Sequence, residues 1–278
     1  MRVTRQPLFG KSPDGKDGAI MIGAIIGDIV GSRFEWNNHR SKDFELFTPA
    51  CEPTDDSIMT LAIAKALISC KGDYSSLGEK AVYWMRKIGQ HYPSCGYGGC
   101  FIEWMFSDNP RPYNSFGNGA AMSVSACGFI AKSLDEAKQL SKSVTEVTHN
   151  HPEGIKGAEA TTTAIFLARS GETIDEIRRV IQESYYPLDF TLDGIRNTYR
   201  FNETCQQTVP QAIEAFLEST SFEDAIRNAI SIGGDSDTLA AITGGIAEAY
   251  YGIPETIRQS AEKYLNPELL EILREFEY

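Results

Sequence analysis

Two short acidic segments lie about 180 residues apart, and each leads straight into a long apolar run. They are Thr54-Asp55-Asp56-Ser57 and Gly234-Asp235-Ser236-Asp237-Thr238. Together they offer four carboxylates and several hydroxyl groups, with no Lys or Arg inside either segment. Mg²⁺, Mn²⁺ and Ca²⁺ prefer such oxygen ligands, whereas Zn²⁺ prefers His and Cys. If one pocket holds both segments, the pattern indicates a pair of metal ions and metal-assisted hydrolysis.

The same residue types also begin ordinary helices. Ser, Thr and Asp are common N-caps, and acidic residues in a first turn complement the helix dipole. One oxygen is enough for a cap, however, and adjacent carboxylates such as Asp55 and Asp56 repel each other. The segments therefore offer more acid than capping needs, and both interpretations stay open from the residues alone.

The elements that would position these residues are helices. From residue 57 onward apolar residues recur at helical spacing, and no alternating strand pattern competes with them. The runs cover residues 58–68, 77–88, 120–131, 134–147, 155–167, 174–181, 209–216, 222–232, 239–250, 257–264 and 269–276. We predict an all-α domain of roughly a dozen helices, in which remote loops can meet at one cleft.

A glycine-rich run near the N-terminus carries two further carboxylates. Glycines at positions 23, 27 and 31 would form one smooth helix face that a neighbouring backbone can approach closely. Asp28 and Glu35 are harder to explain by packing, because apolar helices seldom bury an unpaired carboxylate. Arg33 is a candidate partner for one of them.

Two glycine-rich segments between the acidic ones could bind an anion. They are Tyr97-Gly98-Gly99 and Ser115-Phe116-Gly117-Asn118-Gly119-Ala120-Ala121, and each precedes a helical run. Backbone N–H groups at such a position can point at a phosphate. The alternative is a tight turn in which Asn118 and the glycines are left-handed.

Two of the four histidines lie in Thr148-His149-Asn150-His151-Pro152. An i, i+2 pair beside proline is poor geometry for zinc. His149 could contact a ligand phosphate or ribose, or it could be a structural histidine at the end of the preceding helix.

Bulk properties limit the possible functions. The chain has 278 residues, 42% hydrophobic and 23% charged, with a formal net charge of −12. This balance argues against nucleic acid and anionic membranes as partners. The apolar stretch 19–30 is too short to span a bilayer, and the six cysteines lack the pattern of a disulfide scaffold or a Cys-x-x-Cys pair. We expect a cytoplasmic monomer with loosely ordered residues 1–17 and one domain from 18 to 278.

In their order along the chain, these motifs resemble those of the ADP-ribosylglycohydrolases. The resemblance rests on Gly23-Ala24-Ile25-Ile26-Gly27-Asp28 with Gly31-Ser32 and Glu35, Pro53-Thr54-Asp55-Asp56-Ser57, Ser115-Phe116-Gly117-Asn118-Gly119, Thr148-His149 and Gly233-Gly234-Asp235-Ser236-Asp237-Thr238. It implies an all-α fold, two Mg²⁺ or Mn²⁺ ions, and release of ADP-ribose from modified side chains or small conjugates.

The resemblance also implies a role for each matching position. The metal ligands would be Thr54, Asp55, Asp56, Asp235, Asp237 and Thr238. Glu35 would be the catalytic carboxylate near the scissile bond. The substrate contacts would be Tyr97, Gly98, Gly99, His149 and the diphosphate loop of Ser115, Phe116, Gly117, Asn118, Gly119, Ala120 and Ala121. One departure concerns Ser123, which follows Met122 where many members carry Arg.

Two other functions are compatible with the same residues. One is a noncatalytic ADP-ribose-binding or structural protein, because folds host unrelated functions. The other is a metal phosphohydrolase that cleaves the diphosphate and yields AMP and ribose phosphate. Within the hydrolase interpretation, the linkage that is cut stays open, with arginine as the first expectation among protein linkages.

Overall fold

The computed structural model describes residues 21–277, and their regular secondary structure is entirely helical apart from one isolated β-bridge. The predicted loose segment 1–17 lies outside the described residues. The first half of the chain contains α1 (Gly23–Gly31), η1 (Ser32–Phe34), α2 (Asp55–Cys70), η2 (Tyr74–Ser76), α3 (Leu77–Gly89), α4 (Gly99–Phe106), α5 (Gly119–Met122), α6 (Ser125–Ile130) and α7 (Leu134–Thr145). The second half contains α8 (Pro152–Arg169), α9 (Ile174–Ser184), α10 (Leu192–Ile195), α11 (Cys205–Leu217), α12 (Phe222–Ser231), α13 (Ser236–Tyr251), α14 (Glu255–Ala261), η3 (Glu262–Tyr264) and α15 (Pro267–Glu277).

The helices form one compact domain, as the sequence predicted, but one predicted helix is broken. Residues 120–131 divide into α5 and α6, and two side-chain hydroxyls donate to backbone carbonyls of the first of them. The Ser123 hydroxyl donates to the Gly119 carbonyl at 3.1 Å, and Thr60 Oγ1 donates to the Met122 carbonyl at 3.2 Å. The break lies beside the candidate site, because Met122 and Ser123 line the pocket described below.

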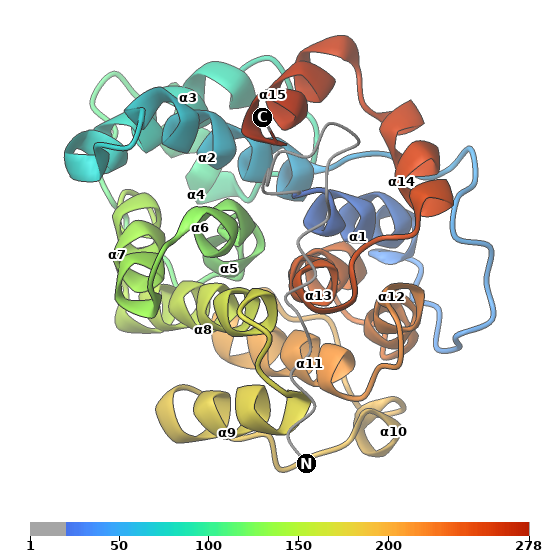
Figure 1. Cartoon of the computed structure of the whole chain (residues 1–278). Coiled ribbons are helices and arrows are strands. Elements are labelled where there is room, and N and C mark those ends of the chain that lie inside the picture. The colour runs from blue at the N-terminus through green and yellow to red at the C-terminus, as the bar shows by residue number, and fades with distance from the viewer. Residues whose placement is uncertain (1–20, 278) are drawn as a thin grey trace.

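Helix α13 lies in the interior of the domain and contacts α1, α8, α11 and α12 (Figure 1). The glycine face of α1 packs directly on α13, as the spacing of four predicted. A Cβ atom added at Gly27 would lie 1.9 Å from the Ala240 carbonyl oxygen, and one at Gly31 would lie 2.5 Å from the Cα atom of Asp237. Only glycine allows this approach, which brings the end of α1 against the start of α13.

A remote carboxylate caps the start of α1. Glu248 of α13 is buried and accepts hydrogen bonds from the backbone N–H groups of Ile22, at 3.2 Å, and Gly23, at 2.6 Å. The first N–H groups of a helix have no partner within the helix, so this contact satisfies donors that would otherwise be buried unpaired. It also fixes the position of α1 along α13.

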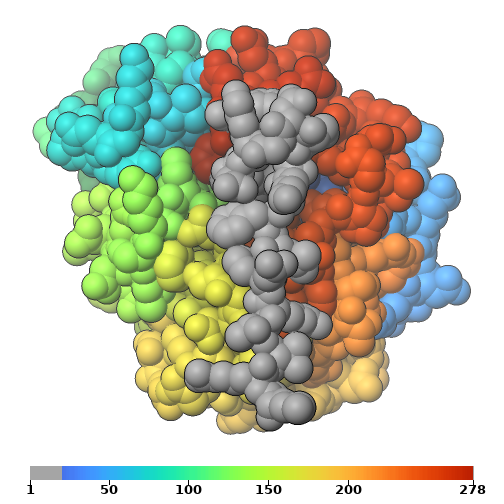
Figure 2. All heavy atoms as spheres, in the orientation of Figure 1, coloured from blue at the N-terminus to red at the C-terminus, as the bar shows by residue number. Residues whose placement is uncertain are grey.

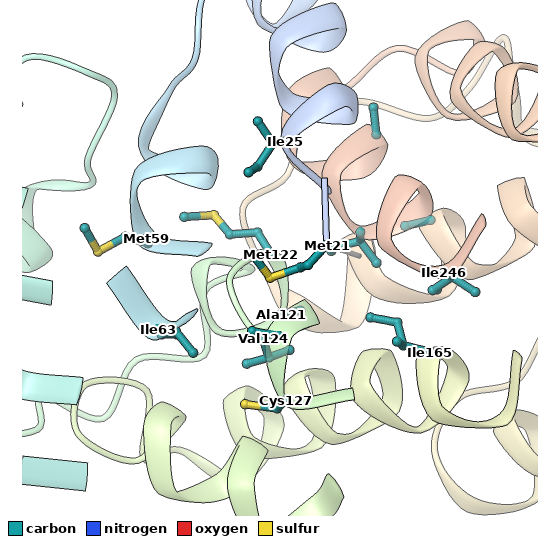
Figure 3. Packing of buried hydrophobic residues seen from close by; sticks show 14 of the residues in the cluster. Met21, Ile25, Met59, Ile63, Ala121, Met122, Val124, Cys127, Ile165 and Ile246 are labelled. Carbon is teal, nitrogen blue, oxygen red and sulfur yellow. The ribbon is translucent and has the colours of Figure 1, made fainter. Parts of the chain in front are cut away.

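Apolar side chains from separate helices fill the interior. Met59, Ile165 and Ile246 come from α2, α8 and α13 and belong to one core cluster (Figure 3). The C-terminal helix α15 packs on α2, so the end of the chain lies beside its first third (Figures 1 and 2). Among residues 21–277, no helix has both the length and the apolar character that a membrane crossing requires.

Candidate active site

The two acidic segments meet at one place, between α1, α2 and α13. Oxygens of Asp28, Asp56 and Asp237 lie within 4.8 Å of one another, and so do oxygens of Glu35, Asp235 and Asp237. Thr238 Oγ1 donates to Asp56 Oδ2 at 3.3 Å across the 182 residues that separate them. The two acidic segments therefore come together in the folded chain, as the sequence predicted.

Asp28 is a site residue to which the sequence interpretation gave no role. It is fully buried, and it accepts hydrogen bonds from the Thr54 N–H at 2.9 Å, Thr54 Oγ1 at 2.6 Å and the Ser57 N–H at 3.1 Å, as well as from the Ser57 hydroxyl. The expectation that Arg33 pairs with Asp28 or Glu35 is wrong. The Arg33 guanidinium donates instead to Thr48 Oγ1 at 3.1 Å and to the Glu45 carbonyl, because the turn after α1 directs it away from the acids.

The capping interpretation accounts for only part of the acidic segments. Thr54 is the N-cap of α2 and accepts from the Asp56 N–H at 3.4 Å. Asp235 occupies the N-cap position of α13, but its side chain makes no capping hydrogen bond. Its Oδ2 atom accepts from the Asn118 amide at 2.7 Å instead. Gly234, with φ +82°, permits the turn that aims Asp235 inward.

Glu35 is held at the edge of the acidic cluster by Asn38. The Asn38 amide donates to the Glu35 carbonyl at 3.0 Å and to the Gly234 carbonyl at 2.8 Å, and its oxygen accepts from the Gly234 N–H at 2.8 Å. Glu35 and the turn before Asp235 therefore share one anchor. The Glu35 side chain is half-buried and borders the pocket.

Burial and mutual repulsion make these carboxyl groups hard to ionise. Burial raises the pKa of Asp28 to about 6, even though its hydrogen bonds act in the opposite direction. Burial, together with the charge of Asp235, raises the pKa of Glu35 to about 7. The pKa values of Asp55, Asp56 and Asp237 lie well above the ordinary aspartate value, mainly because of burial and then because of neighbouring carboxylates.

The acidic cluster has the properties of a site for hard cations. Asp56 Oδ1 is buried and has no hydrogen-bond partner. In the described part of the chain, no Lys or Arg forms an ion pair with any acid of the cluster. A divalent cation would supply the missing partner for this oxygen and the missing counter-charge, so the residues fit such an ion.

A pocket of about 260 Å³ opens over the acids. Most of the residues predicted for the site line it, namely Glu35, Asp55, Asp56, Tyr97, Gly98, Gly99, Ser115, Gly117, Asn118, Gly119, Ala120, His149, Asp235, Asp237 and Thr238. Thr54, Phe116 and Ala121 do not line it. Thr54 instead lies behind the acids, where its hydroxyl donates to Asp28.

The loop at 115–121 borders the pocket, but most of its N–H groups are already paired. The Asn118 N–H donates to the Glu203 carbonyl at 2.7 Å, the Gly117 N–H to Ser115 Oγ at 3.1 Å and the Ala120 N–H to the Gly117 carbonyl at 3.2 Å. The alternative that Asn118 is left-handed is wrong, since its φ is −66°. In this conformation its side chain donates to Asp235.

His149 is buried at the wall of the pocket. Its Nδ1 atom hydrogen-bonds Thr148 Oγ1 at 2.8 Å, and a Cβ atom added at Gly119 would lie 3.3 Å from its Nε2 atom. Burial lowers the pKa of His149 to about 4, so the imidazole is neutral at physiological pH. His151 has a structural role: its ring accepts a hydrogen bond from the Glu153 N–H at 3.1 Å and caps the N-terminus of α8.

Two pocket residues carried no signal in the sequence. Tyr113 and Glu203 line the pocket together with the predicted residues, and so does Thr148, which lies in the motif with His149 but was given no role. Asp28 did have a signal, because a carboxylate inside a glycine-rich apolar helix needs an explanation. Nothing in the spacing of Glu203 relates it to the acids, because a fold-dependent β-bridge between Gly117 and Thr204 brings it there.

The sequence model of the ADP-ribosylglycohydrolase family matches residues 18–276, which include both acidic segments and the loop between them. The chain belongs to the ADP-ribosylglycohydrolase family. Members of this family are glycosidic-bond hydrolases that remove ADP-ribose, and this chain is an enzyme of that kind.

Known proteins agree with this assignment. The ADP-ribosylhydrolase ARH3 of Homo sapiens is 26% identical, over 90% of this chain and 90% of its own length. The ADP-ribosylarginine hydrolase Tri1 of Pseudomonas putida is also 26% identical, over 87% of this chain and 73% of its own length. A solved structure described as an ADP-ribosylglycohydrolase-related protein complex has the same fold, with a TM-score of 0.63 and 20% identity, and covers 92% of this chain and 94% of its own.

Proposed function

We propose that this ADP-ribosylglycohydrolase releases ADP-ribose from ADP-ribosylated side chains or small conjugates with the help of two Mg²⁺ or Mn²⁺ ions. The observation that carries the proposal is the meeting of acids from two remote segments in one cluster, in which the Oδ1 atom of Asp56 is buried and unpaired. The proposed metal ligands are Thr54, Asp55, Asp56, Asp235, Asp237 and Thr238. Asp28 would hold the Thr54 hydroxyl and share the inner end of the same cluster.

The ions, when bound, would polarise ribose hydroxyls and lower the pKa of a nearby water. Glu35 then moves the proton. It either takes a proton from the water that adds to the anomeric carbon or gives one to the leaving group as the glycosidic bond breaks. Its half-buried place at the pocket edge, beside the acids that would hold the ions, supports this role.

The rest of the pocket would bind ADP-ribose. We assign substrate contacts to Tyr97, Gly98, Gly99, Ser115, Phe116, Gly117, Asn118, Gly119, Ala120, Ala121 and His149. Phe116 and Ala121 would act through the shape of the loop, because neither lines the pocket. Neutral His149 has a Nε2 atom that can hydrogen-bond a ligand while Nδ1 is paired with Thr148.

The metal assignment is tested by Asp237→Ala. The variant should lose metal-dependent release of ADP-ribose and keep its helical circular dichroism spectrum, because it removes a ligand from a site with surplus negative charge. Release is measured by chromatography with Mg²⁺, Mn²⁺ or a chelator. A fully active, chelator-resistant variant would defeat the assignment.

The role of Glu35 is tested by Glu35→Gln, which should bind ADP-ribose normally and turn over at least about 100-fold more slowly. Loss of binding as well would make Glu35 structural. Product analysis separates bond types, since glycosidic cleavage yields free ADP-ribose whereas diphosphate cleavage yields AMP and ribose phosphate.

We further propose that residues 18–278 act as one catalytic unit, as a monomer, in the cytoplasm. The family match over residues 18–276 supports the unit. All six cysteines are free thiols, which a reducing compartment preserves. Light scattering of the purified protein tests the monomer, and a dimer mass at micromolar concentration would contradict it.

A further inference from the structure

A buried threonine behind the pocket has no role in the proposed mechanism. Thr208 lies in the first turn of α11, is fully buried and does not line the pocket. Its hydroxyl oxygen accepts a hydrogen bond from the Asn118 amide at 3.2 Å, and the hydroxyl donates its proton to the Asn202 carbonyl at 3.0 Å. The same Asn118 amide donates to Asp235 Oδ2 at 2.7 Å. One side chain therefore connects Thr208 to an acid of the cluster.

The hydrogen bonds of Thr208 determine which way the Asn118 amide faces. A carbonyl oxygen can only accept, so the single proton of the Thr208 hydroxyl goes to Asn202 and the hydroxyl oxygen is left as an acceptor. The group of Asn118 that faces it must therefore be the NH₂ group, whose second N–H points to Asp235. Thr208 imposes this orientation whether or not Asp235 is ionised, because its own proton is already committed. With the amide turned over, the Asn118 oxygen would face the Asp235 carboxylate, and the two acceptors would repel each other.

The acceptor of the Thr208 proton is itself fixed at the start of α11. Asn202 Oδ1 accepts from the Thr204 N–H at 2.9 Å and from Thr204 Oγ1 at 2.6 Å, and Thr204 is the N-cap residue of the helix. The segment also holds the backbone of Asn118, whose N–H donates to the Glu203 carbonyl at 2.7 Å. The segment from Asn202 to Thr208 therefore fixes both the backbone and the side chain of Asn118.

The contact with Asn118 matters for Asp235 because few other donors hold this carboxylate. Asp235 makes no capping hydrogen bond in α13, and its oxygens lie close to those of two further acids, Glu35 and Asp237. An N–H donor stabilises the ionised carboxylate, which is the form that binds a cation. Removal of a hydrogen bond behind a metal ligand typically lowers metal affinity by about 10- to 100-fold.

We propose that Thr208 is a positioning residue for the cation site. It holds the Asn118 amide with its N–H groups toward Asp235, and the amide in turn holds that carboxylate in the acidic cluster. The inference rests on the proposed function, because it treats Asp235 as a metal ligand. It adds a residue that acts only through Asn118 and that no motif in the sequence marks.

The test measures binding of Mn²⁺ to the metal-free full-length protein by electron paramagnetic resonance, which detects the free ion and needs no substrate. Thr208→Val keeps the shape of the side chain, removes the hydroxyl and should weaken Mn²⁺ binding about tenfold. Thr208→Ser keeps the hydroxyl and should retain the affinity of the wild type. Thr243→Val is the matched control, because Thr243 is also fully buried and donates to a backbone carbonyl, that of Ala212, at 2.8 Å. The control should leave the affinity for Mn²⁺ unchanged.

A double-mutant cycle shows whether Thr208 acts through Asn118. Asn118→Ala should also weaken Mn²⁺ binding, and Thr208→Val should add nothing in that background, because the group that Thr208 orients is gone. Additive losses would mean that Thr208 acts by another route. Unchanged affinity in the single variant Thr208→Val would mean that it does not act on the site. Either result would overturn the inference.

Nuclear magnetic resonance of the metal-free protein separates failure of the inference from failure of the proposed function. The side-chain N–H protons of Asn118 should exchange slowly with solvent in the wild type and in Thr208→Ser, and faster in Thr208→Val. If the wild type binds no Mn²⁺, the proposed metal site fails, whereas protection of these protons by the Thr208 hydroxyl would still uphold the orientation of the amide. Equal exchange in Thr208→Val and in the wild type would show that Thr208 does not orient Asn118.

Discussion

At the scale of single residues, the main feature is the cost of the acids to the fold without metal. Asp56 is buried, its Oδ1 atom has no hydrogen-bond partner, and burial and three neighbouring aspartates raise its pKa. Such a group stabilises a protein only when a cation joins it. The buried carboxylates of the cluster are therefore expected to destabilise the folded protein when no metal ion is bound.

Asp56→Asn should separate the effect of this residue on stability from its effect on activity. In chelator the melting temperature should rise, because the change removes one of several repelling carboxylates and adds an N–H donor that its neighbours can accept. Metal-dependent ADP-ribose release should fall by at least about 100-fold. Thermal unfolding and product chromatography measure the two quantities, and Asp108→Asn, at an exposed position, is the matched control. A fall in both stability and activity would argue that Asp56 is structural.

At the scale of elements, the contact of α1 with α13 determines whether the site can form. The glycine spacing predicted this close approach, because residues four apart share a helix face and glycine alone has no Cβ. At Gly27 the neighbour is the Ala240 backbone, which has no flexible end that could yield.

Gly27→Ala should therefore lower the free energy of unfolding by about 3 kcal/mol, because the backbones must separate to admit the methyl group. It should also weaken metal binding, since α1 carries Asp28. Urea unfolding measures the first effect. Gly99→Ala serves as the stability control, because a Cβ atom there meets nothing within 4 Å. Equal stability of the two variants would contradict the close packing.

The remote cap of α1 gives a second prediction at this scale. Glu248→Ala leaves the N–H groups of Ile22 and Gly23 without their acceptor and should cost about 2 kcal/mol in the free energy of unfolding. Glu271→Ala, at an exposed position of α15, should change it little. If both variants unfold at the same urea concentration, the cap does not stabilise α1.

At the scale of the whole molecule, the raised pKa values predict an unusual dependence of stability on pH. Burial raises the pKa of Glu248 from 4.5 to about 7, and Asp28 and Glu35 shift in the same direction. Between pH 4.5 and about pH 7, the folded metal-free protein keeps a proton on Glu248 that the unfolded chain has released. The stabilisation from this proton is complete below pH 4.5 and is lost as the pH rises through about 7.

In chelator the melting temperature should accordingly decrease between pH 5 and pH 7.5. With Mg²⁺ or Mn²⁺ the ionised acids gain a partner, so the stabilisation by metal should grow with pH. Differential scanning calorimetry in the two conditions gives the comparison. Parallel curves would show that the acidic cluster does not bind the added ion.

The sequence predicted the regular parts of this molecule better than its loops. Helical spacing identified the runs that became α2, α3, α7 and α8, and the acidic segments indicated where α2 and α13 begin. The break between α5 and α6 was not predictable, because the apolar spacing of residues 120–131 runs through it without interruption. Glu203 was missed because only the folded chain brings it beside Gly117 and Asn118.

The contact between α1 and α13 also has a consequence for synthesis. A ribosome releases Glu35 and Asp56 long before Asp237, so a growing chain carries only half of the cation cage for most of translation. Ion capture must then wait until α13 has emerged and docked on the glycine face of α1. On the proposed metal assignment, loading with a divalent cation becomes one of the last events in the biogenesis of the enzyme, and it requires that two segments about 180 residues apart have already come together.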